Sequence, residues 1–275
     1  MGTRHVSIDG VAKMVGDKPV VVEWVSPTIM KTKEMKMKRK IRFVARALKS
    51  RFLRDRGEIA CLLKSLKKGS VAVDIGANKG QYTYWMLKSV GSEGQVVAFE
   101  PQPVLANYLN DVKVMFNYKQ LTIEQCGLSS EESRKTLVIP QVGKTQSPLA
   151  TFESTPQEGF ESYQVDVDTM DHYFSQRPQF RPLRFIKCDV EGHEFNVIKG
   201  GLTVIKEDKP DILFECEIRH LKTHTINEIF KLLENIGYTG SFILGEKVIP
   251  LKDFDPLVHQ VFGKKPYANN FIFRF

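Results

Sequence analysis

From residue 58 onward, apolar residues follow two patterns that alternate along the chain. Segments such as residues 81–90 space apolar side chains three or four positions apart, which is typical of helices, whereas short apolar runs are typical of buried strands. Helices are expected over residues 58–68, 81–90, 104–116, 194–205 and 225–238, and strands over residues 70–75, 95–100, 121–126, 184–190 and 210–217. This alternation predicts an α/β fold with a mostly parallel sheet and helices on both faces.

Two regions depart from the alternation. Residues 127–165 are rich in Ser, Thr, Gln, Gly and Pro and hold only short apolar runs, which indicates a hairpin or an insertion near the sheet. After the helix at 225–238, three further apolar runs occupy residues 241–245, 247–251 and 269–275. A hairpin-like pair and a terminal strand predict an antiparallel C-terminal edge on the sheet.

Ahead of residue 58, apolar residues form one stripe at helical spacing, with Lys and Arg over much of the remaining surface. The stripe consists of Met37, Ile41, Val44, Leu48 and Phe52. It predicts a basic amphipathic helix over residues 35–54. Residues 1–30, with an apolar run at 20–25, are expected to form a short strand or hairpin. The expected organisation is an N-terminal arm of residues 1–57 and a domain of residues 58–275.

The net charge of +8 is concentrated in this arm. Residues 31–56 hold 12 of the 40 basic residues and 2 of the 32 acidic residues, so the rest of the chain is close to neutral. Three interpretations of the arm are open: a lid over an acceptor pocket, a helix on an anionic membrane surface, or recognition of an acidic glycan or nucleic acid.

The composition, 42% hydrophobic and 26% charged, is that of a globular protein and excludes a disordered or collagen-like chain. Four widely spaced cysteines without a C-x-x-C pair favour buried free thiols in a reducing compartment. The N-terminal residues lack the apolar core of a signal peptide, and no apolar stretch has the length of a membrane span. We therefore expect a cytoplasmic location.

The first candidate site is the glycine turn at residues 74–80, Asp-Ile-Gly-Ala-Asn-Lys-Gly. It follows a predicted strand and opens a helix, which is where open α/β sheets bind ligands, although a plain tight turn is the alternative. Its G-x-x-x-G spacing differs from the G-x-G-x-x-G of dinucleotide enzymes. Asp74 and Glu100 end neighbouring strands and suit a ribose and an ammonium group. The pattern favours S-adenosylmethionine.

Four ordered sequence blocks resemble the FkbM-type methyltransferase family. They are Asp74–Gly80 (DIGANKG), Ala98–Pro103 (AFEPQP), Val167–Asp171 (VDTMD) and Ile186–Glu194 (IKCDVEGHE). The resemblance covers roughly residues 58–275, and Met170 stands where the family more often has Leu. It implies a class I methyltransferase (Rossmann-like) fold with a seven-stranded sheet. It also implies S-adenosylmethionine as the methyl donor and, commonly, a hydroxyl of a sugar or natural product as the acceptor.

The resemblance also implies a cofactor site. Glu100 would hold the ribose, Pro101 would shape the turn after it, and the loop at residues 126–129 would lie against the adenine. The predicted cofactor-binding residues are Asp74, Gly76, Ala77, Asn78, Gly80, Tyr82, Thr83, Glu100, Pro101, Gly127, Leu128 and Asp189.

A second group of polar residues lies at the ends of the strands at 184–190 and 210–217. Methyl transfer to an alcohol gains from positioning and from a base that takes the hydroxyl proton. Asp189, Glu191 and His193 are the catalytic candidates. His193 has an ordinary pKa suited to a base, whereas Glu191 would need burial. Alternatively, these residues stabilise the loop and the next helix.

The acidic residues also permit a divalent ion with oxygen ligands, Mg²⁺ or Mn²⁺, held by Asp189, Glu191 and Glu215. His220 and His224, four residues apart, would lie at the rim of the acceptor cleft or face solvent.

The expected function is O-methylation of a saccharide, glycolipid or natural product. The chain lacks the Asn/Asp-Pro-Pro-aromatic motif of many amino-directed nucleic-acid methyltransferases, which argues against a nucleic-acid acceptor. Methyl transfer to nitrogen or carboxylate is one alternative. A nicotinamide-dependent oxidoreductase and a non-catalytic module that binds a membrane or an acidic polymer are the others.

Overall fold

The computed structural model describes residues 12–15, 18–21, 27–140, 150–154 and 160–275. The chain divides into two compact units, residues 1–42 and 43–275. In the first unit, β1 (Ala12–Val15) and β2 (Lys18–Val21) pair as an antiparallel hairpin. The apolar run at residues 20–25 extends beyond β2 into residues outside the described part of the chain.

The second unit is built on an eight-stranded sheet with the order β12-β11-β13-β10-β9-β3-β4-β5. The strands are β3 (Val71–Ile75), β4 (Gln95–Phe99), β5 (Leu121–Glu124), β9 (Leu183–Cys188), β10 (Asp211–Glu215), β11 (Thr239–Leu244), β12 (Lys247–Pro250) and β13 (Asn270–Arg274). Strands β5, β4, β3, β9 and β10 are parallel, and β13 runs antiparallel between β10 and β11. The predicted seven-stranded sheet with an antiparallel C-terminal edge is confirmed, and β12 adds an eighth strand.

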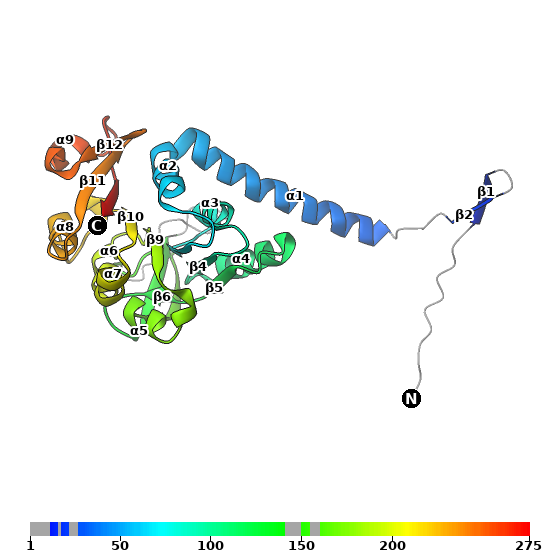
Figure 1. Cartoon of the computed structure of the whole chain (residues 1–275), viewed down its shortest axis with the longest axis horizontal. Coiled ribbons are helices and arrows are strands. Elements are labelled where there is room, and N and C mark those ends of the chain that lie inside the picture. The colour runs from blue at the N-terminus through cyan, green and yellow to red at the C-terminus, as the bar shows by residue number, and fades with distance from the viewer. Residues whose placement is uncertain (1–11, 16–17, 22–26, 141–149, 155–159) are drawn as a thin grey trace. The chain divides into compact units, whose positions relative to one another are not determined.

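Helices cover both faces of the sheet (Figure 1). They are α2 (Arg56–Ser65), α3 (Gln81–Val90) and α4 (Pro103–Phe116) on one face, and α5 (Met170–Ser175), α6 (Glu194–Lys199), α7 (Leu202–Asp208) and α8 (Ile226–Glu234) on the other. Alternate strand residues supply the two cores because successive side chains point to opposite faces. Thus Val73 and Ile75 pack in the α5–α8 core, whereas Ala72 packs in the α2–α4 core. Short elements complete the unit: η2 (Pro178–Phe180), η3 (Ile218–His220), η4 (Leu251–Asp253) and α9 (Pro256–His259).

The helix expected over residues 194–205 is two helices, α6 and α7, separated by Gly200 and Gly201. A Cβ on Gly201 would lie 2.3 Å from the Met170 methyl, and a Cβ on Gly200 would lie 1.9 Å from the Ser129 carbonyl oxygen. The two glycines therefore allow the start of α5 and the loop after β6 to approach this break closely.

The irregular segment forms a separate three-stranded sheet with the order β6-β8-β7, which agrees with the expected hairpin. Its strands are β6 (Gly127–Leu128), β7 (Ser133–Pro140) and β8 (Phe160–Asp168). A bridge between Val138 and Thr151 fixes residues 150–154 beside β7. This contact brings Thr151 and Phe152 to the carboxyl end of the main sheet, where they line a cleft.

The boundary expected between residues 57 and 58 is corrected, because the second unit begins at Phe43. Helix α1 (Pro27–Lys49) is followed by a π-helical segment, η1 (Ser50–Arg54). Phe43 is 1% exposed and packs edge-on against Tyr84, with ring centroids 5.8 Å apart. The Ala47 carbonyl accepts a hydrogen bond of 2.9 Å from the Trp85 indole. The end of the arm is therefore part of the core.

The buried face of this helix also differs from the predicted stripe. The fully buried positions are Phe43, Ala47 and Ser50, whereas Leu48 is 39% and Phe52 57% exposed. Small and polar residues form part of the face that packs against the rest of the second unit. A prediction from hydrophobicity alone therefore assigns the buried face to the wrong residues. A membrane contact through residues 31–56 stays a prediction. Among the described residues, no helix is long and apolar enough to cross a membrane.

Candidate active site

A cleft follows the carboxyl ends of β3, β4 and β9 and continues over the loop after β5. The predicted cofactor-binding residues that line it are Gly76, Asn78, Glu100, Pro101, Gly127, Leu128 and Asp189. Phe99, Leu128 and Phe152 give it apolar walls. We call it the nucleoside cleft, because an apolar slot with one carboxylate at a strand end suits a nucleoside.

A second cleft, of about 410 Å³, adjoins the first and shares Gly76, Asn78 and Asp189 with it. We call it the acceptor cleft. Asp74, Ala77 and Tyr82 line this cleft. Gly80 and Thr83 line neither cleft, so the structure brings ten of the twelve predicted cofactor-binding residues to the two clefts.

Glu100 is 2% exposed at the end of β4, and both of its carboxylate oxygens accept backbone hydrogen bonds. Oε2 accepts from the Asn78 N–H at 2.7 Å and Oε1 from the Gln102 N–H at 2.9 Å. Burial raises the pKa of Glu100 to about 7, although these two bonds favour its ionised form. Each oxygen keeps a lone pair, so the carboxylate can accept the two hydroxyls of a ribose.

Asp74 lies at the end of β3 and is 2% exposed. Its carboxylate accepts a hydrogen bond from the Thr83 hydroxyl on α3. Burial raises the pKa of Asp74 to about 6, and the Thr83 bond opposes this shift. Thr83 therefore positions Asp74 instead of facing a ligand.

The two glycines of the turn are required by packing. Gly76 has φ +77°, and a Cβ there would lie 1.9 Å from the Asp189 carbonyl oxygen. Gly80 has φ +75°, and a Cβ there would lie 2.8 Å from Leu109 and 3.1 Å from Phe43. Gly76 thus lets the ends of β3 and β9 meet, and Gly80 accommodates the end of α1.

A buried lysine connects the carboxylates of the acceptor cleft. Lys187 on β9 is 1% exposed, and its ammonium lies 3.6 Å from Asp189 and 5.1 Å from the Tyr82 ring centroid. Burial alone would lower the pKa of Lys187, but Asp189 and Glu215 outweigh burial and raise it. The lysine stays charged and offsets the cost of placing these acids together.

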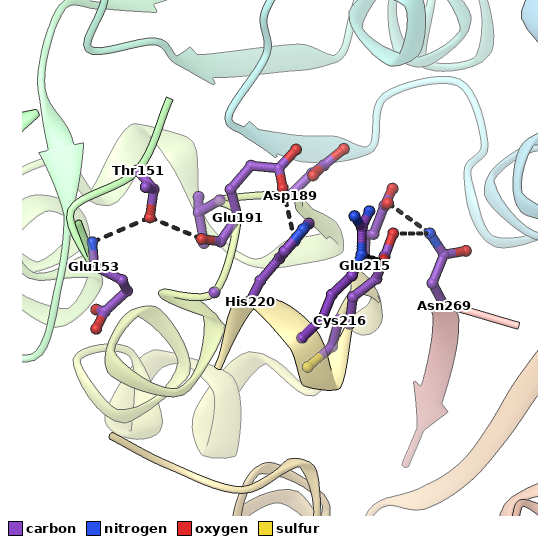
Figure 2. A network of polar contacts seen from close by, with 12 residues as sticks. Thr151, Glu153, Asp189, Glu191, Glu215, Cys216, His220 and Asn269 are labelled. Atoms are coloured by element: carbon purple, nitrogen blue, oxygen red, sulfur yellow. Dashed lines mark hydrogen bonds and ion pairs between the residues drawn. The ribbon is translucent and has the colours of Figure 1, made fainter. Parts of the chain in front are cut away.

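Glu215 ends β10 and accepts a hydrogen bond of 2.6 Å from the Asn269 amide. Figure 2 shows this pair together with Asp189. Burial, reinforced by the negative charge of Asp189, raises the pKa of Glu215 well above its usual range. At neutral pH, Glu215 is therefore the protonated carboxyl of the acceptor cleft.

Glu191, two residues beyond Asp189, pairs with a histidine. His220 Nδ1 lies 2.9 Å from the Glu191 carboxylate, and the Thr151 hydroxyl donates to the Glu191 backbone carbonyl at 2.8 Å (Figure 2). Burial raises the pKa of Glu191 to about 8 and lowers the pKa of His220. Glu191 lines the nucleoside cleft, whereas His220 lines a separate cavity beside Glu191 and not the acceptor cleft, so the structure does not place it at the predicted rim.

The position of His193 does not fit the predicted role of general base. The residue is 2% exposed, and both ring nitrogens are engaged. Nδ1 lies 2.6 Å from Glu153 and Nε2 lies 2.9 Å from the Ser129 hydroxyl. His193 lines neither cleft. Its ring connects Ser129 and Glu153 to the start of α6, so it has no nitrogen free to take a proton from an acceptor.

The predicted metal site at Asp189, Glu191 and Glu215 is not supported. In the described ranges, converging ligand atoms occur only at Glu132, Asp168 and His172, away from these strand ends. Asp189 is paired with Lys187, whose ammonium takes the place that a cation would need.

Several residues of the clefts were not among the predicted site residues, although one interpretation of the arm placed it over the acceptor pocket. Thr151 and Phe152 come from the irregular segment, and Arg46 and Arg54 come from the end of the arm. Lys187 could have been noticed from the sequence, because a lysine inside the apolar run Phe185–Cys188 is unusual for a buried strand.

The sheet order and the clefts at its carboxyl edge define a class I methyltransferase. The family model of the methyltransferase FkbM domain matches residues 74–239, which is more than half of the chain. The chain therefore belongs to the FkbM methyltransferase family. The residues of the nucleoside cleft fit S-adenosylmethionine, which would supply a methyl group when bound.

Methyltransferase 1 of Beauveria bassiana (strain ARSEF 2860) is 28% identical over 146 residues, which cover 48% of this chain and 58% of that protein. Methyltransferase FkbM from Methylobacillus flagellatus KT has 18% identity and a TM-score of 0.45, covering 75% of this chain and 44% of that one. The S-adenosylmethionine-dependent O-methyltransferase of Thermotoga maritima has 16% identity and a TM-score of 0.41, covering 81% and 65%. The match to the fungal relative spans less than two thirds of its length.

Proposed function

We propose that this protein transfers a methyl group to a hydroxyl of a saccharide, glycolipid or related natural product. The observation that carries the proposal is the place of Asp189, whose side chain is 34% exposed and lines both the nucleoside cleft and the acceptor cleft. An acceptor in the second cleft would thus meet a carboxylate at the junction with the methyl donor.

In this proposal the nucleoside cleft holds the cofactor. Glu100 accepts the ribose hydroxyls, and Gly127 and Leu128 lie against the base. The methionine end is held by Asp74, Gly76 and Asn78. The apolar wall formed by Phe99 and Phe152 excludes water from the base.

Asp189 is the proposed general base. A hydroxyl is a poor nucleophile at neutral pH, and a carboxylate that takes its proton in the transition state accelerates attack. Lys187 holds the Asp189 carboxylate from the buried side at 3.6 Å. Protonated Glu215, on the neighbouring strand, can donate a hydrogen bond that positions the acceptor oxygen.

The test is a mass-spectrometric search for the product. The protein, incubated with S-adenosylmethionine and fractionated saccharide and glycolipid extracts, is expected to yield a product heavier by one CH₂. Fragmentation should place the added methyl on an ether oxygen. A methyl group on nitrogen, or an ester cleaved by mild alkali, would contradict O-methylation of a hydroxyl and would assign the alternative acceptor.

A further inference from the structure

The acceptor cleft is lined by both cations and carboxylates. Arg46 on α1, Arg54 on η1 and Lys79 in the β3–α3 turn supply cations in addition to the Lys187–Asp189 pair. The other acids that line it are Asp55, Asp74 and Glu215. All of these residues belong to the second unit of the chain.

Arg46 is half-buried and has a neutral partner where a carboxylate is usual. Its Nη2 donates to the Tyr108 hydroxyl, and its guanidinium carbon lies 5.2 Å from the centroid of that ring. Its Nε is buried and finds no hydrogen-bond acceptor among the described residues. Arg46 lines the cleft and its side-chain partner is a neutral hydroxyl, so its charge is left uncompensated and an anionic ligand in the cleft would be favoured. Tyr108 holds the group in place for such a ligand.

The other two cations have little local compensation. Lys79 is half-buried and takes part in none of the ion pairs found in the described part of the chain. Arg54 is 51% exposed, and its ion pair with Asp55 is long, at 3.8 Å. Among the described residues, the ion pairs of these three cations are thus limited to the long contact of Arg54 with Asp55, whose carboxylate also accepts a hydrogen bond from Ser50.

We propose that the methyl acceptor carries an anionic group, a phosphate or a carboxylate, which Arg46 binds together with Lys79 and Arg54. This inference rests on the proposed function, and it gives the acceptor two contacts in the cleft, its anion with the three cations and its hydroxyl with Asp189. Guanidinium groups bind both oxyanions with paired N–H donors, whereas neutral sugars offer no charge for them. The acceptor class is thus an acidic or phosphorylated hydroxy compound.

The cofactor offers a competing anion, because its methionine end carries a carboxylate. If the three cations held that carboxylate, their loss would weaken the affinity for S-adenosylhomocysteine. If they hold the acceptor, that affinity is unchanged while the affinity for a small oxyanion is lost. The two assignments therefore differ in a direct binding measurement.

The experiment uses the full chain saturated with S-adenosylhomocysteine. Inorganic phosphate and acetate are added separately at constant ionic strength, with sodium chloride as the reference, and the thermal midpoint Tm is followed. We expect one of the two anions to raise Tm by about 3 °C at a tenfold excess over its Kd. Arg46→Gln and Lys79→Gln should each remove most of the rise. Arg134→Gln, an exposed arginine on β7, should keep it.

A response to phosphate or to acetate that depends on Arg46 and Lys79 supports the inference and says which oxyanion the acceptor carries. No response beyond sodium chloride, or an equal response in Arg46→Gln, Lys79→Gln and Arg134→Gln, overturns it. A tenfold loss of S-adenosylhomocysteine affinity in both variants also overturns it, by assigning the cations to the cofactor. If the wild type binds S-adenosylhomocysteine normally but shows no anion response, this inference fails while the proposed function is not contradicted.

Discussion

The Asp189→Asn variant is expected to transfer methyl groups about 10²–10⁴-fold more slowly than the wild type. Asparagine keeps the size of the side chain but cannot take the hydroxyl proton. The rate is measured as S-adenosylhomocysteine formed with the acceptor found in the product search. Binding of S-adenosylhomocysteine, measured in parallel, should change far less than the rate.

Glu215→Gln is the matched control for this variant. Glu215 is protonated at neutral pH because burial and Asp189 raise its pKa, so glutamine mimics its working form. Its rate should stay within about tenfold of the wild type. If Glu215→Gln lost activity as severely as Asp189→Asn, or if Asp189→Asn kept wild-type activity, Asp189 would not be the base.

Phe43→Ala is expected to lower the free energy of unfolding by about 3–4 kcal/mol. The side chain is 1% exposed, packs against Tyr84 and Phe116, and lies against the position of Gly80. Its removal leaves a cavity between α1 and α3 that the rigid turn at Gly80 cannot fill. Urea unfolding of the full chain, followed by circular dichroism, measures the loss.

Phe52→Ala provides the comparison, since Phe52 belongs to the predicted apolar stripe yet is 57% exposed. Its effect should stay below about 1 kcal/mol. Equal effects of the two substitutions would mean that residues 43–49 do not belong to the core and that the domain begins after them.

The sequence predicts the sheet and the nucleoside cleft well because both follow from local patterns. Each strand is a short apolar run between polar turns, and Asp74 and Glu100 stand at the ends of two such runs. Parallel neighbouring strands end at one edge of the sheet, so these acids must come together there. The family blocks then add the identity of the cofactor.

Contacts between residues far apart in the chain could not be predicted from the sequence. His193 meets Ser129, 64 residues away, and Glu153, 40 residues away, and nothing near these residues in the sequence indicates that the three meet. Gly76 lines both clefts, but nothing in the sequence indicates that it also packs against the Asp189 backbone. The predicted contact face of the arm was wrong for a related reason, because a small residue, Ala47, lies on the buried face.

We expect Glu100 to bind the ribose of the cofactor through an ionised carboxylate. Burial raises the pKa of Glu100 to about 7, so the free protein carries this group largely protonated at pH 6 and largely ionised at pH 8. Since the hydroxyls of a ribose donate to the carboxylate, binding favours the ionised form and affinity rises with pH. The rise is at most about tenfold between these two values.

Isothermal titration with S-adenosylhomocysteine at pH 6 and pH 8 tests this role of Glu100. The wild type and a control variant, Glu93→Ala, should bind more tightly at pH 8, because Glu93 is an exposed acid in the turn that precedes β4. Glu100→Ala should bind at least about tenfold more weakly at pH 8 and should lose most of the pH dependence. Unchanged affinity in Glu100→Ala at both pH values would contradict the assignment of the nucleoside cleft.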